Sequence, residues 1–386
     1  MKSGNSILSS YGTTIFTVMS ALASEQGAIN LGQGFPDEDG PLEIRQAAAQ
    51  ASTDLPNQYP PMMGIPALRQ AVAAANKRFY GIDLDWQQSV MVTSGATEAL
   101  AACLFGLIEP GDEVVLIEPL YDSYLPIVRR AGGIPKLVRM EPPTWELPRA
   151  ALEEAFSDRT KLIVINSPHN PAGKVLTPEE LAFLADLIDR HDAFAVCDEV
   201  YEHLVFDGHP HIPLMTLPGM EKRCLRIGSA GKTFSLTGWK VGYISADPDL
   251  LQPVAKAHQF LTFTTPPNLQ HAVALGLGLD DTYFQNLASG LQAKRDFLAD
   301  GLQNIGFDVL DCGGSYFLTV DFRPLGINAE DEALCFTLTE QAKVTPVPIS
   351  AFYQSGGSRH FLRFCFCKRE EVLADALNRL RVYFGA

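Results

Sequence analysis

"KLIVINSPHNPAGKVLTPEELAFLADLIDRHDAFAVCD" (residues 161–198) contains two short, continuously apolar runs separated by a helical segment. Uninterrupted apolar runs of this length are typical of strands that are buried on both faces. The same alternation extends from about residue 42 to residue 285, with further runs at 90–93, 113–118, 224–229 and 240–245. It predicts an α/β fold in which helices cover both faces of a mostly parallel sheet.

The two ends of the chain follow a different pattern. Helices are expected over 13–25 and 282–304, strands over 316–322 and 360–367, and a final helix that carries Leu373, Leu377 and Leu380. We therefore expect residues 42–285 to form a large α/β domain. Residues 1–41 and 286–386 are expected to form a smaller α+β domain together.

The composition is that of an acidic globular protein. Apolar residues make up 46% of the chain, charged residues 19%, and the net charge is −15, which disfavours nucleic acid as a partner. No run approaches the roughly 18 apolar residues of a membrane helix, and the N-terminus lacks the pattern of a signal peptide. The seven cysteines are scattered, which favours a reducing cytoplasm. We expect a cytoplasmic protein that acts on small molecules and contacts neither nucleic acid nor membrane.

Polar residues follow five of the predicted strands. Ligands of open α/β sheets bind outside the carboxyl ends of the strands. The residues at these positions are Ser94 to Thr97, Tyr121, Asn166 to Asn170, Asp198 to Tyr201, and Ser229 to Lys232. We expect these segments to converge on one crevice.

Two other motifs suggest different chemistry. "GKT" at 231–233 resembles the end of a nucleotide-binding phosphate loop, but the glycine that this loop requires is replaced by Arg226. His203, His209 and His211 lie close together, but no matching distant ligands accompany them. Neither nucleotide hydrolysis nor a metal site is predicted.

A pyridoxal phosphate site explains the strand ends better. This cofactor needs a lysine for its Schiff base, a carboxylate at its pyridine nitrogen, a phosphate cup and a partner for its ring oxygen. Lys232 would be the lysine, with a pKa lowered in a poorly solvated site. Asp198 would pair with the pyridine nitrogen, because a buried carboxylate needs a cationic partner. Taken alone, a surface lysine and a helix-capping aspartate remain open alternatives.

The phosphate cup would form where a helix begins after residue 94. The backbone N–H groups of Gly95, Ala96 and Thr97 would meet a phosphate at the positive end of that helix. Ser229 and Lys240 would complete the cup, with Lys240 as a point charge. This signal is weak by itself, since many helices begin with Ser or Thr.

Four further side chains match the same chemistry. Tyr121 would stack on the cofactor ring, and Asn170 with the hydroxyl of Tyr201 would contact the ring oxygen. Arg363 points into apolar surroundings, and its planar guanidinium matches the α-carboxylate of an amino acid. A core tyrosine, an ordinary Asn-Pro turn and an edge arginine are the alternatives for each residue alone.

The chain resembles the class I/II aminotransferases of the fold-type I pyridoxal phosphate enzymes over nearly its whole length. The resemblance rests on "LGQGFPD", "NQYPPMMGIPALRQAVA", "TSGATEAL", "EPLYDSY", "NSPHNPAGKV", "CDEVYEHLVF", "SAGKTFSLTGWKVGY" and "FLRFCF", in the family's order and spacing. Within the family it is most similar to the methionine aminotransferases and to the kynurenine/glutamine aminotransferase branch.

The resemblance implies the same roles for these residues and adds others. It makes Lys232 the catalytic base and Schiff-base lysine, and it places Asn166 and the backbone of Gly34 with Arg363 at the α-carboxylate. It implies a homodimer with shared active sites, in which Tyr59 reaches the phosphate of the neighbouring subunit. Lys240 stands where many members carry arginine.

Phe16, Tyr59, Tyr121 and Phe260 indicate an aromatic, apolar substrate pocket, and no second arginine is placed for a dicarboxylic side chain. We therefore expect an aminotransferase that moves the amino group of an apolar or aromatic L-amino acid to a 2-oxo acid. Methionine is the favoured donor, followed by phenylalanine, tyrosine, leucine, glutamine and kynurenine. A cysteine-S-conjugate β-lyase on the same scaffold is the main alternative. A non-catalytic pyridoxal-binding regulator is disfavoured, since the N-terminal segment lacks a basic recognition helix.

Overall fold

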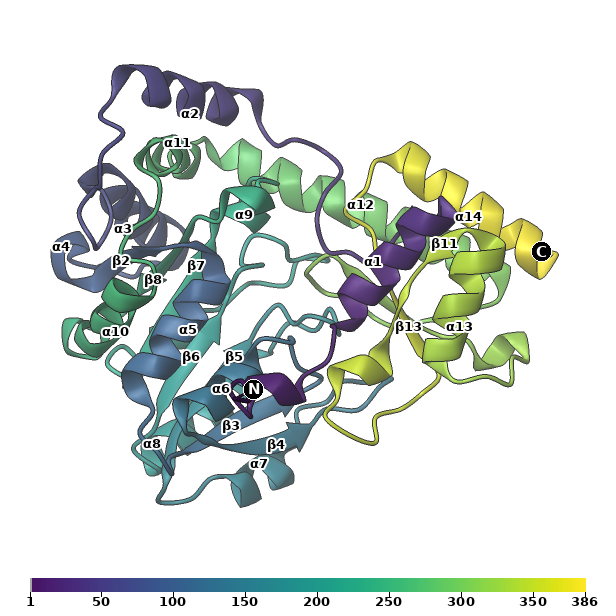
Figure 1. Ribbon diagram of the computed structural model, residues 1–386, viewed down its shortest axis with the longest axis horizontal. Coiled ribbons are helices and arrows are strands. Elements are labelled where there is room, and N and C mark those ends of the chain that lie inside the picture. Colours follow the sequence, from purple (N-terminus) through teal and green to yellow (C-terminus); the bar gives the residue numbers. More distant parts are fainter. Residues whose placement is uncertain (1) are drawn as a thin grey trace.

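The computed structural model describes residues 2–386, and a large twisted sheet lies at its centre (Figure 1). Within the described residues this sheet has seven strands. Their spatial order is β2 (Val90–Thr93), β8 (Gly242–Ser245), β7 (Cys224–Ser229), β6 (Phe194–Asp198), β5 (Thr160–Asn166), β3 (Glu113–Glu118) and β4 (Ile134–Arg139).

The five strands β7, β6, β5, β3 and β4 are parallel to one another. Strand β8 is antiparallel to both of its neighbours, β2 and β7. The mostly parallel α/β sheet is therefore confirmed. The sequence patterns did not indicate β4, whose Lys136 and Arg139 interrupt its apolar character. These side chains are tolerated because β4 lies at the edge of the sheet, where they reach solvent.

Both faces of the sheet are buried beneath helices. In β3, Val114 and Leu116 pack on the face covered by α5 (Gly95–Leu107) and α6 (Tyr124–Ala131). The alternate residues Val115 and Ile117 pack on the other face against α8 (Pro178–Arg190). This two-sided burial explains why the strands are apolar at every position rather than at every second one.

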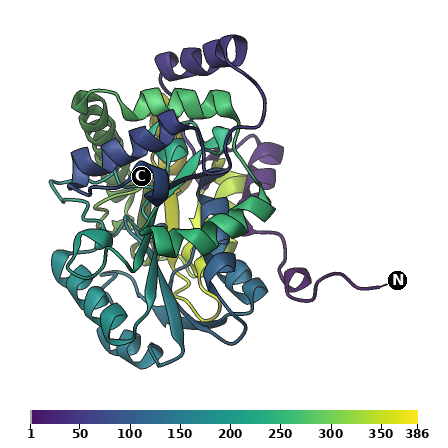
Figure 2. The ribbon, with the colours of Figure 1, turned by 90° about the vertical axis from the view of Figure 1, so that its left-hand side faces the viewer.

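The N-terminal segment joins the C-terminal part of the chain. Strand β1 (Ile29–Asn30) pairs in parallel with β11 (Val344–Thr345), and α1 (Ile15–Gln26) lies among the C-terminal elements (Figure 1). The chain before η1 (Leu8–Ser10) projects away from the rest of the molecule (Figure 2).

An antiparallel sheet forms the centre of this second region. It consists of β12 (Val347–Pro348), β13 (Phe361–Cys365), β10 (Phe317–Asp321) and β9 (Asp308–Val309), in that order. Helix α12 (Asp281–Ile305) runs through the boundary expected between residues 285 and 286. The domain limits 1–41, 42–285 and 286–386 stay predictions.

Other helices complete both regions. They are α2 (Leu42–Asp54), α3 (Pro66–Tyr80), α4 (Trp86–Ser89), α7 (Arg149–Ala155), α9 (Ala230–Thr233), α10 (Pro248–Leu261), α11 (Pro267–Leu277), α13 (Asp331–Thr337) and α14 (Glu370–Phe384). In the part of the chain described here, none of the helices has the length and apolar character that crossing a bilayer would require.

Two glycines of α12 differ sharply in their surroundings. A Cβ atom on Gly301 would lie 2.3 Å from Cδ1 of Leu377 on α14, whereas a Cβ on Gly290 would meet nothing within 4 Å. Leu377 is itself buried in the core. Glycine at position 301 is therefore what allows α12 and α14 to pack closely.

We predict opposite effects for alanine at these two positions. Gly301→Ala should lower the free energy of unfolding by about 1–3 kcal/mol because the extra methyl group overpacks the contact with Leu377. Gly290→Ala should raise it by up to about 1 kcal/mol through helix propensity. Urea unfolding of both variants measures the two shifts, and an equal gain in both would contradict the close contact.

Candidate active site

A cavity of about 340 Å³ lies at the carboxyl ends of the parallel strands. Segments that follow β2, β3, β5, β6 and β7 contribute to its wall, together with β13 and α1. The sequence-predicted residues that line it are Phe16, Gly34, Gly95, Ala96, Thr97, Tyr121, Asn166, Asn170, Asp198, Tyr201, Ser229, Lys232, Lys240 and Arg363. The expected convergence of strand ends on one crevice is thus present.

Asp198 is a buried carboxylate at the end of β6, and one of its oxygens lacks a partner. Oδ2 accepts a hydrogen bond of 2.5 Å from the hydroxyl of Tyr124. Oδ1 is buried and has no hydrogen-bond partner among residues 2–386. Burial raises the pKa of Asp198 to about 6, against the hydrogen bond from Tyr124. An acceptor in this state suits a cationic N–H donor.

Asn166, at the end of β5, holds the neighbouring strand end and loop in place. Its Nδ2 donates to the backbone oxygen of Asp198 over 2.8 Å. Its Oδ1 accepts from the backbone N–H of Asn170 over 2.8 Å. Asn166 therefore orients two other residues of the cavity in addition to lining it.

Lys232 lies on the single turn of α9 directly after β7. Its Nζ donates to the backbone oxygen of Gly34 over 3.0 Å, and it lies 5.4 Å and 5.3 Å from the ring centroids of Tyr201 and Tyr316. Burial lowers the pKa of Lys232, while Cys367 acts in the opposite direction. The lysine is therefore shifted towards the neutral amine that nucleophilic chemistry requires.

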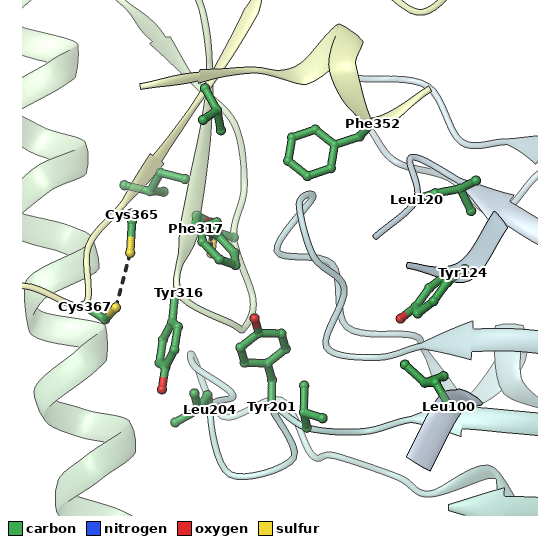
Figure 3. Packing of buried hydrophobic residues seen from close by; sticks show 14 of the residues in the cluster. Leu100, Leu120, Tyr124, Tyr201, Leu204, Tyr316, Phe317, Phe352, Cys365 and Cys367 are labelled. Atoms are coloured by element: carbon green, nitrogen blue, oxygen red, sulfur yellow. Dashed lines mark hydrogen bonds between the residues drawn. The ribbon is translucent and has the colours of Figure 1, made fainter. Parts of the chain in front are cut away.

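Aromatic residues from distant segments gather around Tyr201, one of the two rings close to this lysine (Figure 3). Tyr124 and Tyr201 lie on facing segments, and Tyr316 and Phe317 lie on the far side of Tyr201. The ring of Tyr201 meets those of Tyr316 and Phe317 edge-on at 5.3 and 6.3 Å. These rings exclude water from the amine, which keeps its pKa low.

Arg363 is buried on β13, with the centroid of the Phe317 ring only 3.8 Å from its Cζ. One terminal nitrogen donates to Oδ1 of Asn170 over 2.7 Å, and the other donates to the backbone oxygen of Gly32 over 2.6 Å. Its Nε is buried and unpartnered among the residues described. Burial lowers the pKa of Arg363 to about 10. The contact with Asn170 occupies the amide oxygen and leaves the amide nitrogen free to donate to another acceptor.

Gly95, Gly242 and Lys240 form a cradle at the N-terminus of α5. Gly95 has a φ of +78°, and a Cβ on it would lie 3.2 Å from Nζ of Lys240. A Cβ on Gly242 would lie 2.7 Å from the carbonyl carbon of Gly95. Side chains larger than hydrogen are therefore excluded where the exposed N–H groups of the helix meet the lysine. Such a place binds an anion.

The residues present fit pyridoxal phosphate. Oδ1 of Asp198 offers an unsatisfied buried acceptor for a pyridinium N–H. The cradle at Gly95 and Lys240 would hold the phosphate, and the free amide nitrogen of Asn170 would reach the ring oxygen. Lys232 supplies the amine.

Two predicted site residues lie outside the cavity of this chain. Tyr59 and Phe260 are 84% and 82% exposed, and neither contributes to the cavity wall formed by the described residues. Tyr59 packs edge-on against Phe263 at 5.7 Å. Both roles stay predictions, and both would need a second copy of the chain.

The structure also adds residues that the sequence patterns did not single out. The hydroxyl of Tyr124 donates a hydrogen bond to Asp198. The rings of Phe317 and Phe352 flank the guanidinium of Arg363. The amide nitrogen of Gln33 donates a hydrogen bond of 2.6 Å to Oγ of Ser20 on α1. Tyr124 could have been found, because it follows the same strand end as Tyr121. The other residues belong to segments whose packing against the cavity cannot be inferred from sequence patterns.

Comparisons with known proteins agree with this chemistry. The family model for aminotransferase class I and II matches residues 26–380. The chain is 46% identical to a probable N-succinyldiaminopimelate aminotransferase of Mycobacterium tuberculosis and 39% identical to a methionine aminotransferase of Escherichia coli, over 96% of each sequence. A solved structure of N-succinyldiaminopimelate aminotransferase from Mycobacterium tuberculosis superposes with a TM-score of 0.96 and covers 98% of this chain and 100% of its own.

We predict a distinctive pH dependence of stability for the cofactor-free protein. The pKa of Asp198, about 6 in the folded state, exceeds its unfolded value of about 3.9. The folded state therefore binds more protons between these values, and stability falls as pH rises from about 4 to 6. The loss attributable to Asp198 should reach about 3 kcal/mol.

Asp198→Asn removes this group and should remove its share of the pH dependence. Urea unfolding of both proteins at pH 4, 5 and 6.5 gives the difference directly. Parallel stability curves for the wild type and the variant would contradict a raised pKa of Asp198 in the folded protein.

Proposed function

This chain belongs to the class I and II aminotransferases, and we propose that it transfers the amino group of an apolar or aromatic L-amino acid to a 2-oxo acid. It is a pyridoxal phosphate-dependent aminotransferase. The observation that carries the substrate proposal is the lining of the cavity. Phe16, Tyr121 and Phe317 form apolar walls around Arg363. Among residues 2–386 this is the arginine that lines the cavity, so a dicarboxylic side chain has no second guanidinium to bind.

Pyridoxal phosphate, when bound, carries the amino group between two half-reactions and delocalises the electrons left at the substrate Cα. Arg363 would bind the α-carboxylate with its unpartnered Nε and reoriented terminal nitrogens. Nζ of Lys232 would then take the proton from Cα as a general base, since its lowered pKa favours the neutral amine. Tyr201, Tyr316 and Phe317 keep water away from that proton.

The donor that we favour is methionine, followed by phenylalanine, tyrosine, leucine, glutamine and kynurenine. An apolar pocket distinguishes weakly between apolar side chains, so broad specificity is expected. The relative at 46% identity carries the name of an N-succinyldiaminopimelate aminotransferase, so this amino acid belongs among the donors to be tested. We also propose a cytoplasmic enzyme, on the ground that its seven cysteines are all free and buried.

A donor panel tests the proposal. Each amino acid, with N-succinyldiaminopimelate included, is incubated with the enzyme, pyridoxal phosphate and one 2-oxo acid, and the new amino acid is measured. We expect turnover with methionine and the aromatic donors and little with aspartate. Release of pyruvate and ammonia from cysteine conjugates without amino transfer would favour the β-lyase instead.

A variant pair ties the activity to Lys232. Lys232→Ala should lose the visible absorption of the cofactor-loaded enzyme, and its turnover should fall by at least about a thousandfold. Lys256→Ala, which alters an exposed lysine of α10, should retain both. Wild-type turnover in Lys232→Ala would contradict the assignment.

We further propose a homodimer in which Tyr59 completes the phosphate site of the partner subunit. Tyr59→Phe should then raise the dissociation constant for pyridoxal phosphate by about tenfold or more, because a hydrogen bond to a charged group is lost. Tyr383→Phe on α14 is the matched control. Unchanged cofactor affinity in Tyr59→Phe, or a fully active monomer in sedimentation experiments, would overturn this arrangement.

A further inference from the structure

One charged side chain of the cavity has no role in the chemistry above. The charged residues that line it in the described chain are Asp122, Asp198, Lys232, Lys240 and Arg363. Asp198, Lys232 and Lys240 are assigned to the cofactor, and Arg363 is assigned to the α-carboxylate. Asp122 is the charged residue of this set that has no assigned role.

Asp122 follows Tyr121 in the segment between β3 and α6. It is exposed to solvent and lines the cavity. No side chain of residues 2–386 forms an ion pair or a hydrogen bond with its carboxylate, which has only backbone N–H groups beside it. Desolvation by the surrounding protein raises the pKa of Asp122, while the backbone N–H of Ser123 and the positive charge of Arg363 lower it.

The shared cavity links Asp122 to the substrate. Asp122 and Arg363 line the same cavity of about 340 Å³, so a ligand whose carboxylate is bound by Arg363 shares this cavity with Asp122. Phe16 and Gln33 line the same cavity, but the amide nitrogen of Gln33 already donates to Ser20 and to the backbone oxygen of Phe16. Asp122 is thus the ionisable acceptor available to the far end of a substrate.

We propose that Asp122 is a specificity-determining residue that accepts a hydrogen bond from an N–H group of the substrate side chain and disfavours side chains that end in a carboxylate. This inference rests on the proposed function and changes the order of its donors, because it places side chains that end in an N–H group ahead of the thioether of methionine. Amide, arylamine and acylamino side chains carry the required donor. Thioether and alkyl side chains fit the apolar walls but leave the carboxylate without a partner.

The physical basis is the difference between three kinds of contact. An N–H group bonded to a carboxylate forms a charge-assisted hydrogen bond. An apolar group of the same shape displaces water from the carboxylate and offers no hydrogen bond in its place. A second carboxylate adds repulsion between like charges. The order of affinity should therefore be amide, then alkyl, then carboxylate.

Three ligands that lack an amino group test this order without turnover. Glutaramate, 5-methylhexanoate and glutarate share a carboxylate for Arg363 and end in an amide, an isopropyl group and a carboxylate of similar shape. Calorimetry with the cofactor-loaded enzyme gives their dissociation constants. We expect glutaramate to bind about fivefold more tightly than 5-methylhexanoate, and glutarate to bind most weakly.

Asp122→Asn removes the charge and preserves the shape. In this variant the preference for glutaramate over glutarate should shrink by about fivefold or more. In kinetics, KM for glutamate should fall relative to KM for glutamine, with a smaller change in the ratio of their kcat values. Asp158→Asn, which removes an exposed carboxylate between α7 and β5, should behave as the wild type.

The outcomes separate the two proposals. Wild-type protein that transaminates no donor would overturn the proposed function itself. An active enzyme whose three dissociation constants keep the same ratios in Asp122→Asn would overturn the role of Asp122 alone. Loss of the amide preference in Asp122→Asn but not in Asp158→Asn supports it.

Discussion

A carboxylate buried in a protein interior must find a cation, become protonated or destabilise the fold. Asp198 is placed under this constraint at the end of β6, with one oxygen bonded to Tyr124 and the other without a partner. The neighbouring strands β5 and β7 flank this residue. The amide of Asn166 on β5 fixes the backbone of Asp198, and Lys232 follows the next strand on its other side. The acceptor is maintained for a ligand, and protein side chains do not satisfy it.

Arg363 connects the two chemical tasks of the cavity. It reaches the site from β13, in the C-terminal part of the chain, and donates to Oδ1 of Asn170, which follows β5 of the large sheet. The same guanidinium that suits a substrate carboxylate therefore orients an amide that suits the cofactor. A substrate that binds Arg363 would alter this hydrogen bond. Binding of the substrate carboxylate would therefore change the orientation of the Asn170 amide at the cofactor end of the cavity.

The sequence predicted the parallel sheet and most of the cavity lining because both depend on local patterns. Apolar runs identify buried strands, and strand ends of a parallel sheet must meet at one edge. It did not predict Phe352 beside Arg363, because that contact depends on how the C-terminal region packs against the sheet. Strand β4 was missed because edge strands tolerate charge. The roles of Tyr59 and Phe260 stay predictions, because both side chains are exposed outside the cavity and would act only through contacts with a second chain.

The cradle at the start of α5 limits how this enzyme can be redesigned. A Cβ on Gly242 would clash with the backbone of Gly95, and a Cβ on Gly95 would crowd the side chain of Lys240, so a side chain at either position would distort the cradle. Combinatorial libraries aimed at new substrates should therefore leave these positions constant and diversify the wall around Phe16, Gln33 and Asp122. The glycines at the start of α5 are thus constrained by backbone packing, whereas the cavity wall around Phe16, Gln33 and Asp122 is where new specificities can be selected.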